Sequence, residues 1–120
     1  MSTRSSIAVL NPDSTVRAIY CHFDGYPEGV GQTLKDYWTD PAKVEQLLDL
    51  GNISILAETI GEKVDFDNHP ENVTLAYSRD RGETGQEAHT FANFEAWVES
   101  FYNSDQEYGY LFDGKSWEQS

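Results

Sequence analysis

The chain has a single cysteine, Cys21, so it cannot form an internal disulfide bond. It has no hydrophobic run long enough for a membrane-spanning helix. No apolar segment follows its first residues, as one would in a secretory signal peptide. From these absences we expect a cytoplasmic protein that makes no contact with a membrane.

Basic residues are also scarce. Eight Lys and Arg residues stand against 21 Asp and Glu, for a formal net charge of −13. Binding to a nucleic-acid backbone depends on cations, so direct contact with nucleic acid is disfavoured. A partner protein with a basic surface is favoured, because opposite charges steer such encounters. The alternative that the acidity only maintains solubility stays open.

The hydrophobic content is sufficient for a core. Of the 120 residues, 38% are hydrophobic and 13% are aromatic. A chain of this length forms one domain as a rule, and it needs neither a metal nor disulfides to do so. We therefore expect a single domain over residues 1–120.

The stretch from Val16 to Gly31 holds the highest concentration of chemically reactive and hydrogen-bonding side chains. Its alternation predicts a strand whose core face carries Ile19, Cys21 and Phe23. The opposite face then carries a phenol, an imidazole and a carboxylate, on Tyr20, His22 and Asp24. A glycine-rich loop containing Tyr26 follows and leads into a helix. Backbone N–H groups at such a junction can hold an anion, but a plain tight connection is the alternative.

The remaining patterns predict the other elements in order. We expect strands at residues 5–10, 73–77, 108–112 and 115–117, and helices at residues 31–38, 41–50 and 91–102. The segment at residues 53–57 is ambiguous, and a short helical turn that ends at Gly61 is the favoured interpretation. This order predicts an α+β fold: a mainly antiparallel sheet, built from two terminal hairpins and a middle strand, that about three helices cover on one face.

Two of the four arginines flank an aspartate after the middle strand, at Arg79 and Arg81. A guanidinium can fork onto a carboxylate or a phosphate. The two arginines are therefore candidate anion-binding groups. Local pairing with Asp80 or Glu83 is the alternative.

Acidic residues gather in two further places. A polar loop carries Asp65, Asp67 and Glu71, but it lacks the ligand order, the glycine and the terminal glutamate of a calcium loop. Glu95 and Glu99 lie four residues apart on the outer side of the last predicted helix. We expect these five residues to form an acidic surface, and we predict no metal and no cofactor.

Catalysis is not the favoured interpretation. A hydrolase would use His22 as its base, Asp24 to orient that base, and Arg79 or Arg81 as an anion clamp. An obvious nucleophile is missing, because Cys21 points to the opposite face of the strand. We therefore assign no catalytic residue.

Several segments resemble one group of proteins. The segments are residues 3–8 (TRSSIA), 19–26 (IYCHFDGY), 43–54, 78–83 (SRDRGE) and 113–115 (DGK). Together they are similar to small accessory proteins of tailed phages and prophages, over nearly the whole chain. The resemblance implies a protein made inside a bacterial cell during infection, and it carries over no catalytic residue.

Charge and resemblance together lead to one hypothesis: a non-enzymatic protein that binds and inhibits a host defence or nucleic-acid-handling protein. Mimicry of nucleic acid is the mode of inhibition that the acidic charge suggests. The alternative is a protein that sequesters a small ligand, such as a nucleotide signal. In that case six residues would converge on one pocket: Tyr20, His22, Asp24, Tyr26, Arg79 and Arg81. A small hydrolase using His22 is the third possibility.

Overall fold

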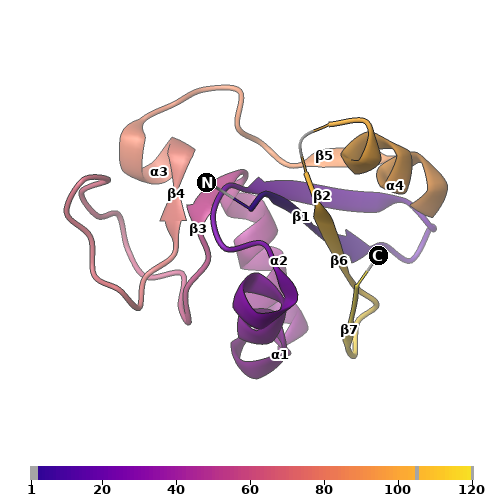
Figure 1. Cartoon of the computed structure of the whole chain (residues 1–120), viewed down its shortest axis with the longest axis horizontal. Helices are drawn as coiled ribbons and strands as arrows, with labels where there is room; N and C mark the ends of the chain where they lie inside the picture. Colours follow the sequence, from indigo (N-terminus) through magenta and orange to yellow (C-terminus); the bar gives the residue numbers. More distant parts are fainter. Residues whose placement is uncertain (1–2, 105, 120) are drawn as a thin grey trace.

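A computed structural model describes residues 3–104 and 106–119 (Figure 1). The elements are β1 (Ser5–Leu10), β2 (Val16–Cys21), the π-helical turn η1 (Pro27–Gly31), α1 (Gln32–Tyr37), α2 (Pro41–Leu50), β3 (Ile53–Ile55), β4 (Leu75–Ala76), α3 (Tyr77–Arg81), β5 (His89–Phe91), α4 (Phe94–Tyr102), β6 (Tyr108–Phe112) and β7 (Trp117–Gln119).

The two longest strands, β1 and β2, form the centre of the sheet. They pair antiparallel from Ser5–Cys21 to Leu10–Val16, as expected for a hairpin. The strand order is β4-β3-β2-β1-β6-β7, with β5 also paired to β2. β1 pairs with β6 in parallel, so the first and last thirds of the chain meet in the middle of the sheet.

The outer edge of β2 is shared by two short strands. β5 pairs with its first half antiparallel, and β3 joins its end in parallel at Cys21–Ile53. Between them, the side-chain oxygen of Asn52 accepts the backbone N–H of Tyr20 at 2.9 Å. Asn52 is itself held by Gln86, through both the backbone (2.7 Å) and the side chain (3.0 Å). A side chain therefore spans the gap between the two strands.

Helices cover both faces of the sheet. On one face α1 and α2 enclose the larger core, in which Trp38 is fully buried. On the other face α4 encloses a smaller core around Trp97 and Phe101. Figure 1 shows α1 and α2 below the sheet and α4 above it. The expectation that helices cover only one face is therefore corrected, because alternate residues of β1, such as Ile7 and Ala8, enter different cores.

The α+β class is confirmed, and so are the helices at residues 32–37 and 41–50. Asp40 caps α2 as expected, accepting the N–H of Ala42 at 3.0 Å. The helix ends at Gly51, which has a φ of 82°. Such backbone strongly favours glycine, so the local signals at both ends of this helix are reliable.

The strand count is corrected. Among the described residues the sheet has seven strands, not two hairpins and one middle strand, and it is accompanied by four α-helices. Residues 53–55 form a strand rather than a helical turn, because pairing with β2 and β4 outweighs the weak local preference. The expected strand at residues 73–77 shrinks to Leu75–Ala76, and Tyr77 begins α3.

The last helix is shorter than expected at its start. Phe91 lies in β5, and α4 begins after Asn93, whose side chain accepts the N–H of Ala96 at 2.8 Å. The buried side of α4 is formed by Trp97 and Phe101, whereas Phe94 is 40% exposed. An N-cap therefore marks the start of this helix more reliably than the first aromatic residue does.

Candidate functional site

Tyr20 and His22 lie on the α4 side of the sheet and contact each other. The Tyr20 hydroxyl is 2.6 Å from Nδ1 of His22, and the His22 ring meets that of Phe23 edge-on at 4.5 Å. Burial raises the pKa of Tyr20, while Arg4 acts to lower it. Burial, with Arg4 as a second cause, lowers the pKa of His22. Both shifts fit a hydrogen bond in which a neutral phenol is the donor and a neutral imidazole is the acceptor.

Asp24 and Tyr26 form a separate pair in the loop that follows. The Tyr26 hydroxyl donates to the Asp24 carboxylate at 3.4 Å, and that carboxylate raises the pKa of Tyr26. Asp24 has a φ of 57°, and its carbonyl accepts the N–H of Val30 at 2.7 Å. The hydrolase arrangement needs Asp24 to orient His22, whereas the bond described for Nδ1 of His22 is to Tyr20.

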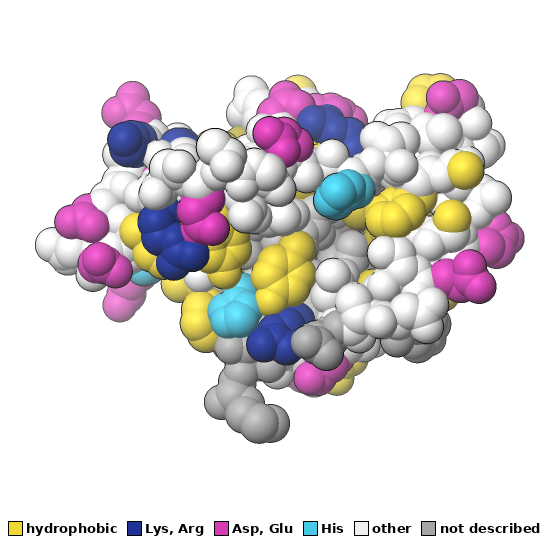
Figure 2. Space-filling model, turned by 90° about the horizontal axis from the view of Figure 1, so that it is seen from above, with side chains coloured by type: hydrophobic (Ala, Val, Ile, Leu, Met, Phe, Trp, Pro, Cys, Tyr) yellow, Lys and Arg dark blue, Asp and Glu magenta, His cyan; other side chains and the backbone are white. Residues whose placement is uncertain are grey.

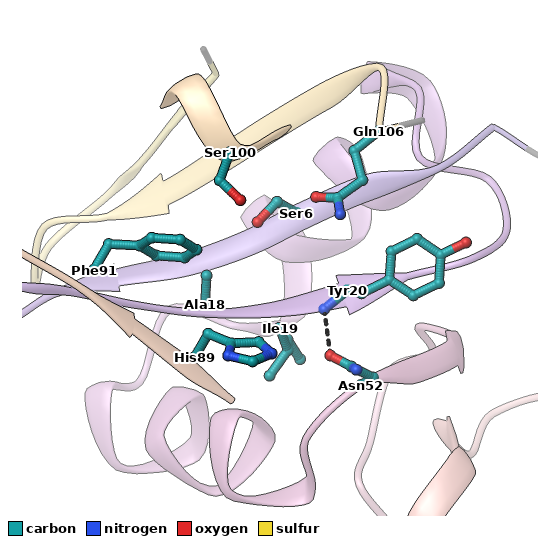
Figure 3. A pocket seen from close by; sticks show the side chains of 9 residues that line it. All are labelled: Ser6, Ala18, Ile19, Tyr20, Asn52, His89, Phe91, Ser100 and Gln106. Atoms are coloured by element: carbon teal, nitrogen blue, oxygen red, sulfur yellow. Dashed lines mark hydrogen bonds between the residues drawn. The ribbon is translucent and has the colours of Figure 1, made fainter. Parts of the chain in front are cut away.

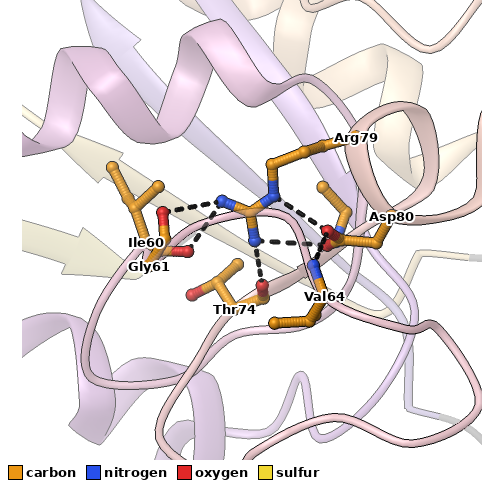
Figure 4. Close-up of polar contacts among 7 residues, drawn as sticks. Ile60, Gly61, Val64, Thr74, Arg79 and Asp80 are labelled. Carbon is orange, nitrogen blue, oxygen red and sulfur yellow. Dashed lines mark hydrogen bonds and ion pairs between the residues drawn. The ribbon is translucent and has the colours of Figure 1, made fainter.

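The side chain of Arg79 is already bound inside the protein (Figure 4). Its guanidinium donates to the carbonyls of Ile60 (2.8 Å), Gly61 (3.1 Å) and Thr74 (2.7 Å). It also forks onto both carboxylate oxygens of Asp80, at 2.9 and 3.2 Å. All three nitrogens therefore have partners, and the local-pairing alternative describes this arginine.

Asp80 completes this network. Its carboxylate accepts the N–H of Val64 at 3.0 Å and of Ala76 at 2.8 Å, and its side chain is fully buried. Burial raises its pKa, but the hydrogen bonds from Arg79 and the two amides outweigh burial and leave the pKa below its ordinary value. The carboxylate is therefore charged at neutral pH and fully used by the fold.

Arg81 takes part in a different contact at the surface. Its guanidinium pairs with Glu83 and lies over the rings of Phe66, at 4.5 Å, and Tyr77, at 5.0 Å. The two rings are themselves 5.7 Å apart. Arg81 thus ties the loop that contains Phe66 to α3.

The six predicted ligand-binding residues are therefore divided among four local arrangements. The hydrogen bonds described above join Tyr20 to His22 and Asp24 to Tyr26, and they join Arg79 to Asp80 and Arg81 to Glu83. Cys21 points into the main core, and burial raises its pKa to about 12. A thiol with this pKa is not a nucleophile at neutral pH.

The acidic residues named from the sequence are exposed but separate. Asp65, Asp67 and Glu71 lie in the long connection between β3 and β4, and Glu95 and Glu99 lie on α4. Figure 2, which looks onto the α3, β5 and α4 side, shows most acidic side chains toward the outline of the molecule. Basic, histidine and hydrophobic side chains gather in the middle of that view.

A hollow of about 280 Å³ opens on the same side of the sheet, beside α4 (Figure 3). Of the six predicted ligand-binding residues, only Tyr20 lines the hollow. The other lining residues were not predicted as site residues from the sequence. They come from separated segments and include Asn52, Phe91 and Gln106. No local motif marks them, because they meet only through the pairing of β5 with β2 and the position of α4.

Within residues 3–104 and 106–119, no three His, Cys, Asp or Glu side chains are grouped so as to hold a metal ion. In the same residues no helix combines the length and apolar character needed to cross a bilayer. Comparisons with protein-family models, with curated proteins and with solved structures find no match for this chain. Function is therefore inferred from the residues themselves.

Proposed function

We propose that the protein is a non-enzymatic inhibitor that binds a basic surface of a host defence or nucleic-acid-handling protein in the bacterial cytoplasm. The carrying observation is the connection between β3 and β4, residues 56–74, which we call the acidic loop. It holds five exposed acids and one lysine: Glu58, Glu62, Lys63, Asp65, Asp67 and Glu71.

The length of the acidic loop supports a binding role. Connections of more than about 15 residues without regular structure are uncommon in compact domains and are often functional. In Figure 1 this segment extends away from the sheet at the end of the molecule opposite α4 and β7. A projecting loop is well placed to enter a groove on a partner.

The loop is also held in a defined shape. Thr59 and Val73 form a bridge, and the Thr59 hydroxyl donates to the Asn72 carbonyl at 2.8 Å. Arg79 and Asp80 fix residues 60, 61, 64 and 74 through the backbone. Because the loop is ordered before binding, its charges can be presented without a large loss of entropy.

Charge supports the class of target. A surface with five acids and one lysine matches a groove that is lined with cations for phosphates. The resemblance to phage accessory proteins supports a host protein as the owner of that groove. Competition with nucleic acid is the consequence expected of such binding.

The test is affinity capture from bacterial lysate at low and physiological salt, followed by competition with duplex DNA. We expect a stoichiometric basic protein whose capture weakens as salt rises but persists at physiological salt, and which DNA displaces. The triple variant Glu62→Gln, Asp67→Asn, Glu71→Gln should lose most of this capture, because it removes three of the loop's charges.

The matched control removes three exposed acids elsewhere: Glu87→Gln, Glu99→Gln, Glu118→Gln. It has the same net charge as the loop variant and should still capture the partner. Equal loss in both variants would show that total charge, not the loop, is responsible. Absence of any DNA-displaceable partner at physiological salt would overturn the proposal.

A further inference from the structure

The hollow beside α4 exists because small side chains lie beneath it. Ser6 of β1 and Ala18 of β2 form part of its floor, and Figure 3 shows them between Phe91 on one side and Tyr20 on the other. Ser6 is 4% exposed and Ala18 is 4% exposed. Larger residues there would fill the space, so the hollow follows directly from the sequence of β1 and β2.

The described lining residues carry no formal charge. Among the described residues that line the hollow, none is Asp, Glu, Lys or Arg, although such residues make up 24% of the chain. A charged ligand group would lose hydration there, and these lining residues would offer it no counter-charge in return. The lining therefore favours an uncharged ligand.

Hydrogen-bonding groups converge on the hollow from β1, from α4 and from the connection before β6. The Ser6 hydroxyl accepts the Trp97 indole N–H at 2.8 Å, so its own proton remains to be donated. Ser100 of α4 and Gln106 before β6 add a hydroxyl and an amide at the rim. Within the described part of the chain, no side-chain hydrogen bond engages Ser100 or Gln106. These groups suit a ligand with both donors and acceptors along its edge.

Aromatic rings border the same space. Phe91 and the imidazole of His89 both come from β5, two residues apart, and so share one face of that strand. Rings in such positions stack on flat ligands. The volume of about 280 Å³ is near the lower limit of small-molecule sites, which suits a ligand of one or two fused rings with little more attached.

We propose that this hollow binds an uncharged, planar heterocycle of nucleobase size, stacked against Phe91 and hydrogen-bonded by Ser6, Ser100 and Gln106. The site does not involve the acidic loop or its anchor Arg79. A negative result for ligand binding in the hollow would therefore leave the proposed partner binding untouched. A negative result for partner binding would equally leave the proposed ligand site untouched.

The test is an NMR titration of the isotopically labelled protein, in which the chemical shifts of the backbone amides report binding. The probes are adenosine and cytidine, with ribose as the control that lacks a base. We expect saturable shifts confined to residues around Ala18, Phe91, Ser100 and Gln106 for a nucleoside, and none for ribose. Adenosine monophosphate should bind no more tightly than adenosine.

Two pairs of variants locate the site. Ser100→Phe should block the hollow and weaken nucleoside binding at least 10-fold, whereas Glu99→Phe, at the neighbouring exposed position, should not. Phe91→Ala should weaken binding in the same way, and Phe94→Ala should not. Gln106→Ala, at the rim, provides a milder test should a bulky variant fail to fold.

Three outcomes would overturn the inference: no saturable shift with either nucleoside at millimolar concentration, shifts centred elsewhere on the molecule, or unchanged binding in folded Ser100→Phe protein. Tighter binding of adenosine monophosphate than of adenosine would overturn the uncharged class of ligand.

Discussion

Arg79 and Asp80 are neighbours in the chain and form an ion pair, with Nε of Arg79 2.9 Å from Oδ1 of Asp80. Both side chains also bond the backbone of the acidic loop. One dipeptide of a short helix therefore fixes the shape of a loop that is far longer than the helix. The first two predictions follow from this pair.

Arg79→Ala should lower the free energy of unfolding by about 3–5 kcal/mol, because it leaves the buried carboxylate of Asp80 without its counter-charge. Urea denaturation measures this. Arg81→Ala is the matched control, and it should cost about 1 kcal/mol or less, since the Arg81–Glu83 pair lies at the surface, with its side chains 49% and 33% exposed. Equal losses in the two variants would contradict the anchoring role of Arg79.

The charge state of Asp80 should make stability depend on acid pH. Its folded pKa lies below its ordinary value of 3.8, so the unfolded chain takes up the proton first as the pH falls. Stability from this group is complete above about pH 4 and is lost as the pH drops through the folded pKa. Asp80→Asn should be less stable at pH 7 and should lose this part of the pH dependence in denaturation curves measured between pH 2 and 5.

His22 should titrate below its ordinary pKa of 6.5, because burial and Arg4 disfavour its protonated form. The unfolded chain then binds the proton more readily, so the native state loses stability as the pH falls below about 6.5. The NMR signal of the His22 ring reports the midpoint directly. A midpoint at or above 6.5 would contradict burial and Arg4 as the causes that lower this pKa.

Gly51→Ala should destabilise the protein more than Gly82→Ala. Both glycines have positive φ, 82° and 72°, so each substitution carries a backbone strain of about 1 kcal/mol or more. A Cβ at Gly51 would also lie 2.1 Å from the Gln86 carbonyl oxygen, whereas nothing lies within 4 Å of one at Gly82. Thermal denaturation of the two variants isolates the effect of this collision, and equal melting temperatures would contradict the close approach of residues 51 and 86.

The sequence predicted the elements that carry strong local signals. The hairpin at residues 5–21 follows from alternation, and α2 follows from Asp40 and Gly51 at its ends. The strand at Ile53–Ile55 and the parallel pairing of β1 with β6 were not predicted. Both depend on partners distant in the chain, and short apolar runs do not reveal such partners.

The candidate site was predictable only in part. Tyr20 was correctly placed on the face opposite Cys21, because strand alternation is a local property. The role of Arg79 depended on the carbonyls of Ile60 and Gly61, which no pattern around Arg79 indicates. The hollow is equally invisible in the sequence, since its lining comes from segments that only the fold brings together.

The shared outer edge of β2 has a consequence for behaviour at high concentration. Strands with unpaired backbone groups invite pairing with other chains and so promote aggregation. Along β2 the edge is closed in turn by β5, by the side chain of Asn52 and by β3, and the residues that follow donate to Ile53 and Ser54. This strand therefore offers a second copy of the chain no continuous ladder to extend, and the closed edge protects the protein against self-association through β2.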